Sequence, residues 1–316
     1  MGEIKVPWAI NDHGKLTEIN NATKDDNYYC PSCKTSLIIR KGKINVHHYA
    51  HKACDYCSQE TVIHKTAKFL LQKIVSDWKN GLTKAPKIFR ECQICLSSVE
   101  QPLPDKVQSA EVEVKLENGF IVDVALMGSR KILAGIEVKV THEISSEKAE
   151  LMPIPFIEID GNVFLENPNE IVVILDKFNP VTCNECKEKL RKYVKRAKKI
   201  AKDLNIDLPS SFYRFGITSC WKCKKEILVF TWPNHSLFSK NEPLKKPKPQ
   251  SIRFEYSNTI KTKYWVNCCT FCESIQGDYY LYNRSGEPFW SLDIGGDNRE
   301  DYYHDMLTIA YQSEFI

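Results

Sequence analysis

Two apolar stretches between Gly119 and Val140 carry charged residues at positions where a buried strand is normally apolar. Asp123 interrupts the first stretch, and Glu137 and Lys139 interrupt the second. An unpaired charge inside a protein costs on the order of several kcal/mol. Carboxylates are good ligands for Mg²⁺, or for Mn²⁺, and an ammonium can stabilise charge that develops on a phosphate. The pattern therefore predicts a divalent-cation site with phosphodiester chemistry.

Strand geometry can bring these three side chains together. Residues two apart on a strand face the same side, so we expect Glu137 and Lys139 to share a face. A paired neighbouring strand can place Asp123 beside them. Asp123 and Glu137 would then bind the metal, while Lys139 would orient the nucleophile or stabilise the transition state.

A helix is predicted from Ser58 to Trp78, with Ser58 as its N-cap. Its apolar face consists of Val62, Ala67, Leu70, Leu71, Ile74 and Val75. Glu60, His64 and Lys68 recur every four residues and form one stripe of this helix. The stripe is either a solvent-exposed network or a row that faces the catalytic site, and helix periodicity alone does not decide between them.

The elements after this helix indicate an α/β fold. Strand patterns cover 106–116, 119–126 and 132–140, a helix pattern covers 145–152, and a further strand pattern follows in "PIPFIEID". Helix, three strands, helix and strand in this order predict a sheet with helices packed on it. Asp123 falls on the second strand and Glu137 on the third.

Twelve of the thirteen cysteines form six CxxC pairs, which in a reduced compartment are typical of structural zinc sites. We assign one site to Cys30, Cys33, His48 and His51, because a gap of two residues would let both histidine rings turn toward one metal. The pairs Cys220/Cys223 and Cys269/Cys272 form a second site and leave Cys268 spare. Cys92/Cys95 with Cys183/Cys186 is a candidate third site, for which Cys54/Cys57 competes.

The net charge of +4 over 316 residues is modest, and the positive charge is local. Between Lys187 and Lys202, nine of sixteen residues are Lys or Arg on a helix that keeps an apolar face. This helix is either a solvated face or a phosphate-binding surface on which Arg191, Arg196 and Lys199 contact nucleic acid. The sequence lacks a signal peptide and a membrane span, so we expect a cytoplasmic protein without membrane contact.

An Asp followed fourteen residues later by Glu-x-Lys resembles the core of the PD-(D/E)xK nuclease superfamily. Together with "CPSC…HHYAH", "QETVIHKTAK", "VDVAL" and "IEVKVTHEISSEK", it looks like the competence protein CoiA-like nuclease family over roughly residues 28 to 160. The resemblance implies a restriction-endonuclease-like core, metal binding by Asp123 and Glu137, a catalytic Lys139, and Glu60 and His64 from the first core helix. Val122 departs from this pattern, because Arg or Pro is more familiar before the Asp.

The last third of the chain resembles the C-terminal zinc ribbons that accompany such nucleases. Each of its two CxxC pairs is followed by a strand rich in aromatic and β-branched residues. The aromatic residues Tyr264, Trp265, Tyr279 and Tyr280 could stack on bases, although a role in a buried core is the more common one.

We therefore expect four regions: a zinc-binding segment at 1–57, a nuclease core at 58–180, a CxxC pair and basic helix at 181–209, and a zinc-ribbon domain at 210–316. The expected function is Mg²⁺- or Mn²⁺-dependent hydrolysis of DNA, in DNA processing or in defence against foreign DNA. Two other classes stay open: a catalytically silent nucleic-acid-binding protein with a nuclease-like fold, and a zinc-rich scaffold with a protein partner. Strandedness, DNA against RNA and the oligomeric state are open as well.

Overall fold

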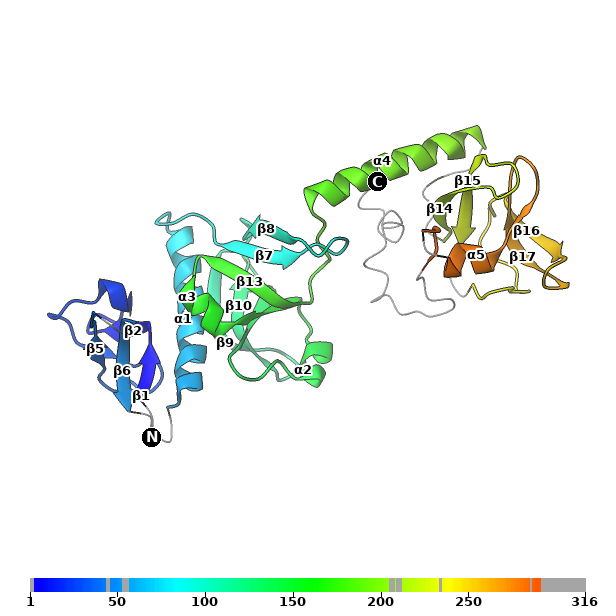
Figure 1. Cartoon of the computed structure of the whole chain (residues 1–316). Coiled ribbons are helices and arrows are strands. Elements are labelled where there is room, and N and C mark those ends of the chain that lie inside the picture. The colour runs from blue at the N-terminus through cyan, green and yellow to red at the C-terminus, as the bar shows by residue number, and fades with distance from the viewer. Residues whose placement is uncertain are drawn as a thin grey trace. The chain divides into compact units, whose positions relative to one another are not determined.

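The computed structural model describes residues 3–43, 46–52, 57–204, 208, 212–232, 235–284 and 286–290. The chain divides into two units (Figure 1). Unit 1 consists of residues 1–91 and 98–181, and unit 2 consists of residues 92–97 and 182–316. The short segment 92–97 is therefore part of the same unit as residues 182–316, although residues 98–181 separate the two in the sequence.

The N-terminal part of unit 1 contains two small antiparallel sheets, with strand orders β3-β2-β4 and β1-β6-β5. Their buried residues, among them Val6, Tyr28 and Tyr49, form one apolar cluster that also contains Cys30 and Cys57. The elements are β1 (Glu3–Val6), β2 (Trp8–Asn11), β3 (Leu16–Glu18), a 3-10 helix (Ile19–Asn21), β4 (Tyr28–Tyr29), β5 (Ile38–Arg40) and β6 (His48–Lys52).

Helix α1 (Gln59–Lys79) connects the N-terminal sheets to the rest of unit 1 (Figure 1). Ser58 is its N-cap, and the Ser58 side chain accepts a hydrogen bond from the Thr61 amide, as predicted. Near its start, Val62 packs in the N-terminal cluster. Ile63, Ala67, Leu70, Leu71 and Val75 pack against a seven-stranded sheet. The predicted apolar face of the helix is therefore buried.

The large sheet has the strand order β8-β7-β13-β12-β11-β10-β9 and contains both parallel and antiparallel pairs. Its strands are β7 (Lys87–Glu91), β8 (Ser98–Pro102), β9 (Ser109–Lys115), β10 (Ile121–Met127), β11 (Ile132–Lys139), β12 (Phe156–Asp160) and β13 (Glu170–Asp176). Two short helices, α2 (Ser146–Leu151) and α3 (Gly161–Glu166), lie between strands in the chain. The α/β class and the order α1, β9, β10, β11, α2, β12 agree with the sequence prediction.

Close packing holds α3 against the sheet and α1. A Cβ atom placed on Gly161, the first residue of α3, would lie 3.0 Å from a Val138 methyl and 3.4 Å from an Ile63 methyl. The distance to Val138 is tighter than ordinary van der Waals contact, so the small residue lets α3 approach β11 closely. The strands β7, β8 and β13 and the helix α3 were not predicted from the sequence.

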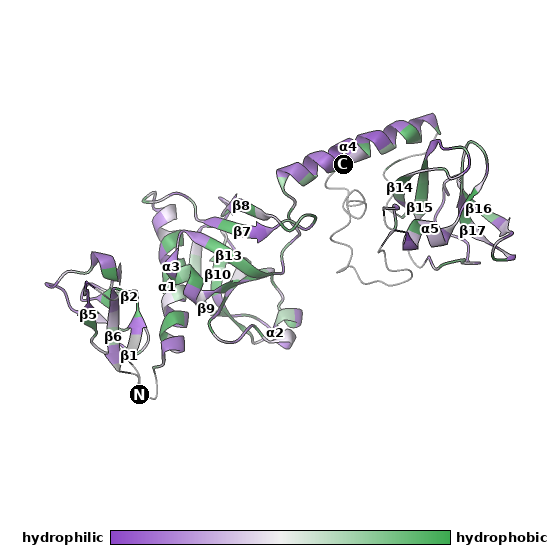
Figure 2. Ribbon diagram, in the orientation of Figure 1, coloured by the Kyte–Doolittle hydropathy of each residue, from purple (hydrophilic) through white to green (hydrophobic). Residues whose placement is uncertain are grey.

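The described residues of unit 2 form α4 (Asn184–Asp203), five strands and a short helix. Leu190, Val194, Ala197 and Ala201 of α4 are buried, as predicted, against the pair β14 (Arg214–Ser219) and β15 (Glu226–Thr231). Figure 2 shows the rest of α4 as largely hydrophilic. A second sheet contains β16 (Ile252–Ser257), β17 (Thr262–Cys268) and β18 (Ile275–Gln276), and α5 (Asp278–Asn283) follows.

Across the part of the chain that the structure describes, none of the helices combines the length and the hydrophobicity that a membrane span requires.

Candidate functional site

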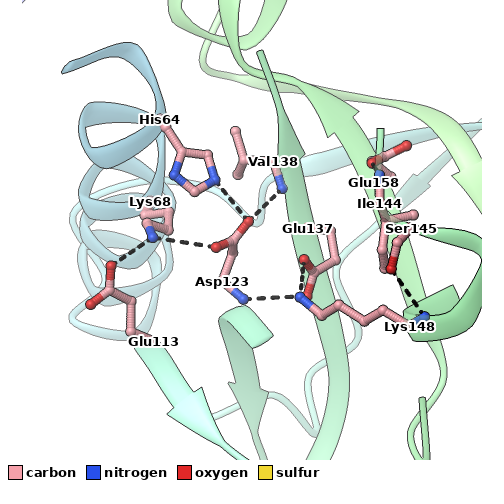
Figure 3. A network of polar contacts seen from close by, with 10 residues as sticks. All are labelled: His64, Lys68, Glu113, Asp123, Glu137, Val138, Ile144, Ser145, Lys148 and Glu158. Atoms are coloured by element: carbon pink, nitrogen blue, oxygen red, sulfur yellow. Dashed lines mark hydrogen bonds and ion pairs between the residues drawn. The ribbon is translucent and has the colours of Figure 1, made fainter. Parts of the chain in front are cut away.

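Asp123 and Glu137 lie side by side where β10 and β11 stop pairing (Figure 3). The last paired residues at this end of the ladder are Val124 and Ile136. Beyond them, the Val138 amide donates to Asp123 Oδ2 at 3.0 Å, and the Asp123 amide lies 3.4 Å from Glu137 Oε1. Each carboxylate therefore accepts a backbone amide of the other's strand. This arrangement holds the two predicted metal ligands next to each other.

Two residues of the polar stripe of α1, His64 and Lys68, reach Asp123 on the sheet, while Glu60 is exposed. His64 Nε2 lies 3.0 Å from Asp123 Oδ2, and Lys68 Nζ lies 3.3 Å from Asp123 Oδ1. Lys68 is buried, and its ammonium also contacts Glu113 Oε1 at 2.7 Å. These contacts place His64 and Lys68 beside Asp123 (Figure 3), and a catalytic role for the stripe stays a prediction.

Glu60, at the start of the same stripe, accepts a hydrogen bond from the Thr141 hydroxyl. Thr141 follows β11 by two residues, so Glu60 lies beside the end of the strand that carries Glu137 and Lys139. Helix α1 therefore contributes an acidic group at this strand end, and contributes His64 and Lys68 deeper along the sheet.

Asp123 is held in its ionised form. Burial raises the pKa of Asp123, but the hydrogen bond and charge of His64, the Val138 amide and the charge of Lys68 outweigh it and lower the pKa to about 2. A carboxylate with such a pKa carries its full negative charge at neutral pH, and charged oxygen atoms are what Mg²⁺ and Mn²⁺ prefer.

The pKa of Glu137 is shifted in the opposite direction, upward. Burial raises its pKa, and the negative charge of Asp123 raises it further. Lys148 of α2 opposes this shift, because its Nζ lies 2.6 Å from Glu137 Oε2. Two adjacent carboxylates with one raised pKa are typical of a site in which further positive charge is favourable.

Lys139 forms an ion pair with Glu143, which follows β11 in the chain. Its Nζ lies 2.8 Å from Glu143 Oε1, and this hydrogen bond raises the pKa of Lys139. The ammonium that contacts Glu137 is that of Lys148. The catalytic role of Lys139 stays a prediction.

Sequence reasoning missed Glu158 on β12, which is the register partner of Glu137. Glu158 is buried, and its Oε1 accepts the Ile144 amide at 2.6 Å. Burial raises the pKa of Glu158, against the effect of that hydrogen bond. The signal was present, because Glu158 interrupts an apolar strand in the same way as Asp123 and Glu137 do. Lys68 was visible in the helical stripe and Lys148 is the last residue of the motif "IEVKVTHEISSEK", but neither was assigned to the site.

The N-terminal cysteine cluster differs from the predicted set in one ligand. Cys30, Cys33, His51 and Cys57 bring their ligand atoms within 4.8 Å of one another, a grouping that could hold zinc. The assignment of His48 is wrong. His48 and His51 both lie on strand β6, where residues three apart point to opposite faces, and His48 Nδ1 lies 2.8 Å from the Val46 carbonyl. Cys57 takes that place, and its predicted partner Cys54 lies outside the described residues.

Residues 11–60 match the family model for the N-terminal domain of competence protein CoiA. The matched segment contains all four residues of the N-terminal cluster and ends at Glu60, in the first turn of α1. The large sheet with Asp123 and Glu137, and all of unit 2, lie outside it. The comparison with curated proteins and the comparison with solved structures give no match.

Among the described residues of unit 2, two further clusters could hold zinc. Cys220, Cys223, Cys269 and Cys272 form one, and Cys92, Cys95, Cys183 and Cys186 form the other. In each, the four sulfur atoms lie within 4.8 Å of one another. The second cluster explains why segment 92–97 belongs to unit 2.

Four of the CxxC pairs adopt the same turn. In each, the amide of the residue after the second cysteine donates to the carbonyl of the first cysteine, at 2.9 to 3.0 Å. That residue has a positive φ of 57° to 61° in all four turns, although none is glycine: Lys34, Leu96, Lys224 and Glu273. This shared geometry, in a backbone region that L residues rarely adopt, suits a turn that directs two thiolates to one ion.

The Cys183/Cys186 pair is built differently, because it starts a helix. Cys183 is the N-cap of α4, and its sulfur atom accepts the Cys186 amide at 3.4 Å. The Cys183 amide in turn donates to Cys92 Sγ at 3.3 Å. The cluster thereby fixes the first turn of the basic helix.

Two of the three residues proposed to bind phosphate on α4 have acidic partners. Arg191 pairs with Glu188, and Arg196 pairs with Glu226 of β15. Lys199 is exposed. The charge that α4 can offer to a polyanion is therefore smaller than its sequence indicated, and phosphate binding by this helix stays a prediction.

Proposed function

We propose that unit 1 is a metal-dependent nuclease that hydrolyses phosphodiester bonds in DNA. The observation that carries this proposal is the placement of the Asp123 and Glu137 carboxylates side by side at the end of a strand pair, with His64 and Lys68 of α1 around Asp123. Charged groups are costly in a sheet of this kind, and a catalytic site gives them a reason to be there.

The two carboxylates suit a hard divalent cation. Asp123 offers a fully ionised carboxylate, and burial together with the charge of Asp123 raises the pKa of Glu137 even though Lys148 opposes the shift, so further positive charge beside Glu137 is favourable. We assign Asp123 and Glu137 as the metal ligands. Glu158 on the neighbouring strand β12 is a candidate third carboxylate ligand. When bound, Mg²⁺ or Mn²⁺ would lower the pKa of a water ligand and offset negative charge in the transition state.

The residues of the chain itself have separate tasks in this proposal. His64 and Lys68 keep Asp123 ionised and fix the orientation of its carboxylate. Lys139, at the end of β11, supplies an ammonium that can stabilise charge on the scissile phosphate, since its present partner Glu143 is exposed and easily displaced. Glu60 lies at the same strand end and can position a water molecule.

DNA is the proposed substrate, and two observations support a role in its handling. The segment 11–60 matches a domain of a competence protein, which points to a competence-related role. Three cysteine clusters that could hold zinc give the chain rigid modules of a kind that many nucleic-acid-binding proteins use.

One observation favours the alternative of a catalytically silent nucleic-acid-binding protein. Each carboxylate already has an ammonium from the chain, Lys68 for Asp123 and Lys148 for Glu137. Such pairs can stabilise the fold without a metal ion.

A cleavage assay separates the two functions. The purified chain is incubated with labelled single-stranded DNA, duplex DNA and RNA, in Mg²⁺, in Mn²⁺ and in EDTA. We expect cleavage that requires the divalent ion and that is lost in Asp123→Asn, because the substitution removes a charged ligand while it keeps the shape of the side chain. No cleavage of any substrate would favour the silent alternative, and cleavage that persists in Asp123→Asn would contradict the assigned role of Asp123.

A further inference from the structure

A hollow of about 790 Å³ lies in unit 2 beside the Cys220/Cys223/Cys269/Cys272 cluster. Its lining includes the turn of residues 218–224 around Trp221, called the knuckle below, the turn that joins β16 to β17, strand β18 and helix α5. The carboxylate site of unit 1 contributes no residue to it. This hollow therefore needs an explanation of its own.

The walls of the hollow carry aromatic side chains that face solvent. Trp221 is 62% exposed, Tyr279 is 59% exposed and Tyr280 is 60% exposed. Large aromatic residues gain most from burial, so several of them exposed at one hollow mark a binding surface. Tyr264 also lines the hollow, but its side chain is buried and is not among the exposed rings.

The exposed rings are held in place. Trp221 Nε1 donates to the Ile275 carbonyl at 2.7 Å, which fixes the indole at the edge of β18. The rings of Tyr279 and Tyr280 meet edge to face, with centroids 5.8 Å apart. Rigid rings lose little conformational entropy when a flat ligand stacks on them.

Positive charge surrounds these rings. Lys222 and Lys224 of the knuckle and Arg284 after α5 line the hollow, and all three are exposed. Glu287 is the acidic residue among the lining side chains, and it accepts a hydrogen bond from the Thr218 hydroxyl at 2.9 Å. The surface thus combines flat apolar faces with a surplus of cations.

We propose that this hollow binds single-stranded nucleic acid. Unpaired bases would stack on Trp221, Tyr279 and Tyr280, while Lys222, Lys224 and Arg284 would contact phosphates. Paired bases present only their edges, so a duplex cannot use the aromatic faces in this way. Binding at the hollow holds whether or not unit 1 cleaves DNA, and it would give the chain a preference for unpaired strands.

Binding is measured on the full chain in the Asp123→Asn background without Mg²⁺, so that cleavage cannot interfere. The probe is a fluorescein-labelled dT 15-mer, followed by fluorescence anisotropy. We expect Trp221→Ala, and separately the double variant Tyr279→Ala with Tyr280→Ala, to weaken binding about five- to hundredfold, the range found for loss of one stacked base. Trp221→Phe keeps an aromatic face and should retain most of the affinity.

The matched control is Phe254→Ala, an aromatic residue of β16 that is 43% exposed but does not line the hollow. It should bind the probe as the parent does. Lys222→Ala should lower the slope of log K against log salt by roughly 0.7, the value for one phosphate contact on a single strand. Zinc content equal to that of the parent verifies that each variant is folded. Unchanged affinity in the aromatic variants, or competition by duplex as strong as that by single strand, would overturn the proposal.

Discussion

Lys68 is the residue that most clearly links the helix to the candidate site. Its side chain is 5% exposed, and its ammonium contacts both Asp123 and Glu113. Removing one partner of a buried ion pair leaves the other charge uncompensated, at a cost of about 3 to 5 kcal/mol. Because His64 and the Val138 amide remain on Asp123, we expect Lys68→Met to lower the free energy of unfolding by roughly 3 kcal/mol, the low end of that range. Urea unfolding measures the change. Lys65→Met, at a less buried position of the same helix, should change stability far less.

The same contacts set how unit 1 responds to acid. Although burial raises the pKa of Asp123, its contacts with His64, the Val138 amide and Lys68 lower it from 3.8 to about 2, so the ionised form favours the folded state. This contribution is fully present above pH 3.8 and is lost as the pH falls through about 2. In Lys68→Met the pKa of Asp123 should rise, and the acid unfolding midpoint should move to higher pH. A midpoint that does not move would show that Lys68 does not stabilise the charged form of Asp123.

The zinc ligands of the N-terminal cluster give a second test at the scale of residues. We expect about one zinc per cluster, hence three per chain in the described clusters. Cys57→Ser should lose one of them, because it removes a thiolate from the cluster. His48→Asn should lose none, because His48 lies outside the cluster. Elemental analysis of the purified variants measures both. Loss of zinc in His48→Asn with full zinc in Cys57→Ser would restore the original assignment.

At the scale of elements, the cysteine clusters fix turns and helix ends. The Cys92/Cys95/Cys183/Cys186 cluster contains the N-cap of α4 and a residue of its first turn. Without the ion, the amides of this first turn would lose an ordered partner, and the start of the helix should fray. We expect Cys186→Ser to speed hydrogen exchange over residues 184–190 while the amides near Ala197 and Ala201, which pack on β14 and β15, stay protected.

Cys268→Ser is the matched control for this experiment, since Cys268 is buried but belongs to none of the three clusters. It should leave exchange at the start of α4 unchanged. If Cys186→Ser also leaves it unchanged, the cluster does not hold the helix end.

Elements with strong local signals could be predicted from the sequence, and elements that depend on distant partners could not. The apolar periodicity and the Ser58 cap define α1, and the charges within apolar strands mark Asp123 and Glu137. The His48 prediction failed because it treated two histidines on a strand as if they could share one face. β13 pairs in parallel with β7, which lies far from it in the chain. The residues of either strand carry no local sequence signal for this pairing.

At the scale of the whole molecule, the division into units follows from contacts that sequence spacing does not show. Cys95 and Cys183 lie 88 positions apart, yet their sulfur atoms are 3.7 Å apart and join segment 92–97 to unit 2. The sequence identified both pairs but could not establish that they share a site. The two proposed functions likewise separate by unit: carboxylate chemistry in unit 1, and an aromatic, basic hollow in unit 2.

The central claim is that Asp123 and Glu137 form a metal-dependent catalytic site. Its most direct test is the rate of DNA cleavage in Mg²⁺ by Glu137→Gln, compared with the parent and with Glu111→Gln, which changes an exposed carboxylate on β9 of the same sheet. Circular dichroism and zinc content first establish that all three proteins are folded. We predict that Glu137→Gln loses cleavage by at least about a hundredfold, as expected for loss of a charged group that stabilises the transition state, while Glu111→Gln cuts like the parent. Equal rates for Glu137→Gln and the parent would contradict the claim, and the charges between β10 and β11 would then be a structural ion-pair network.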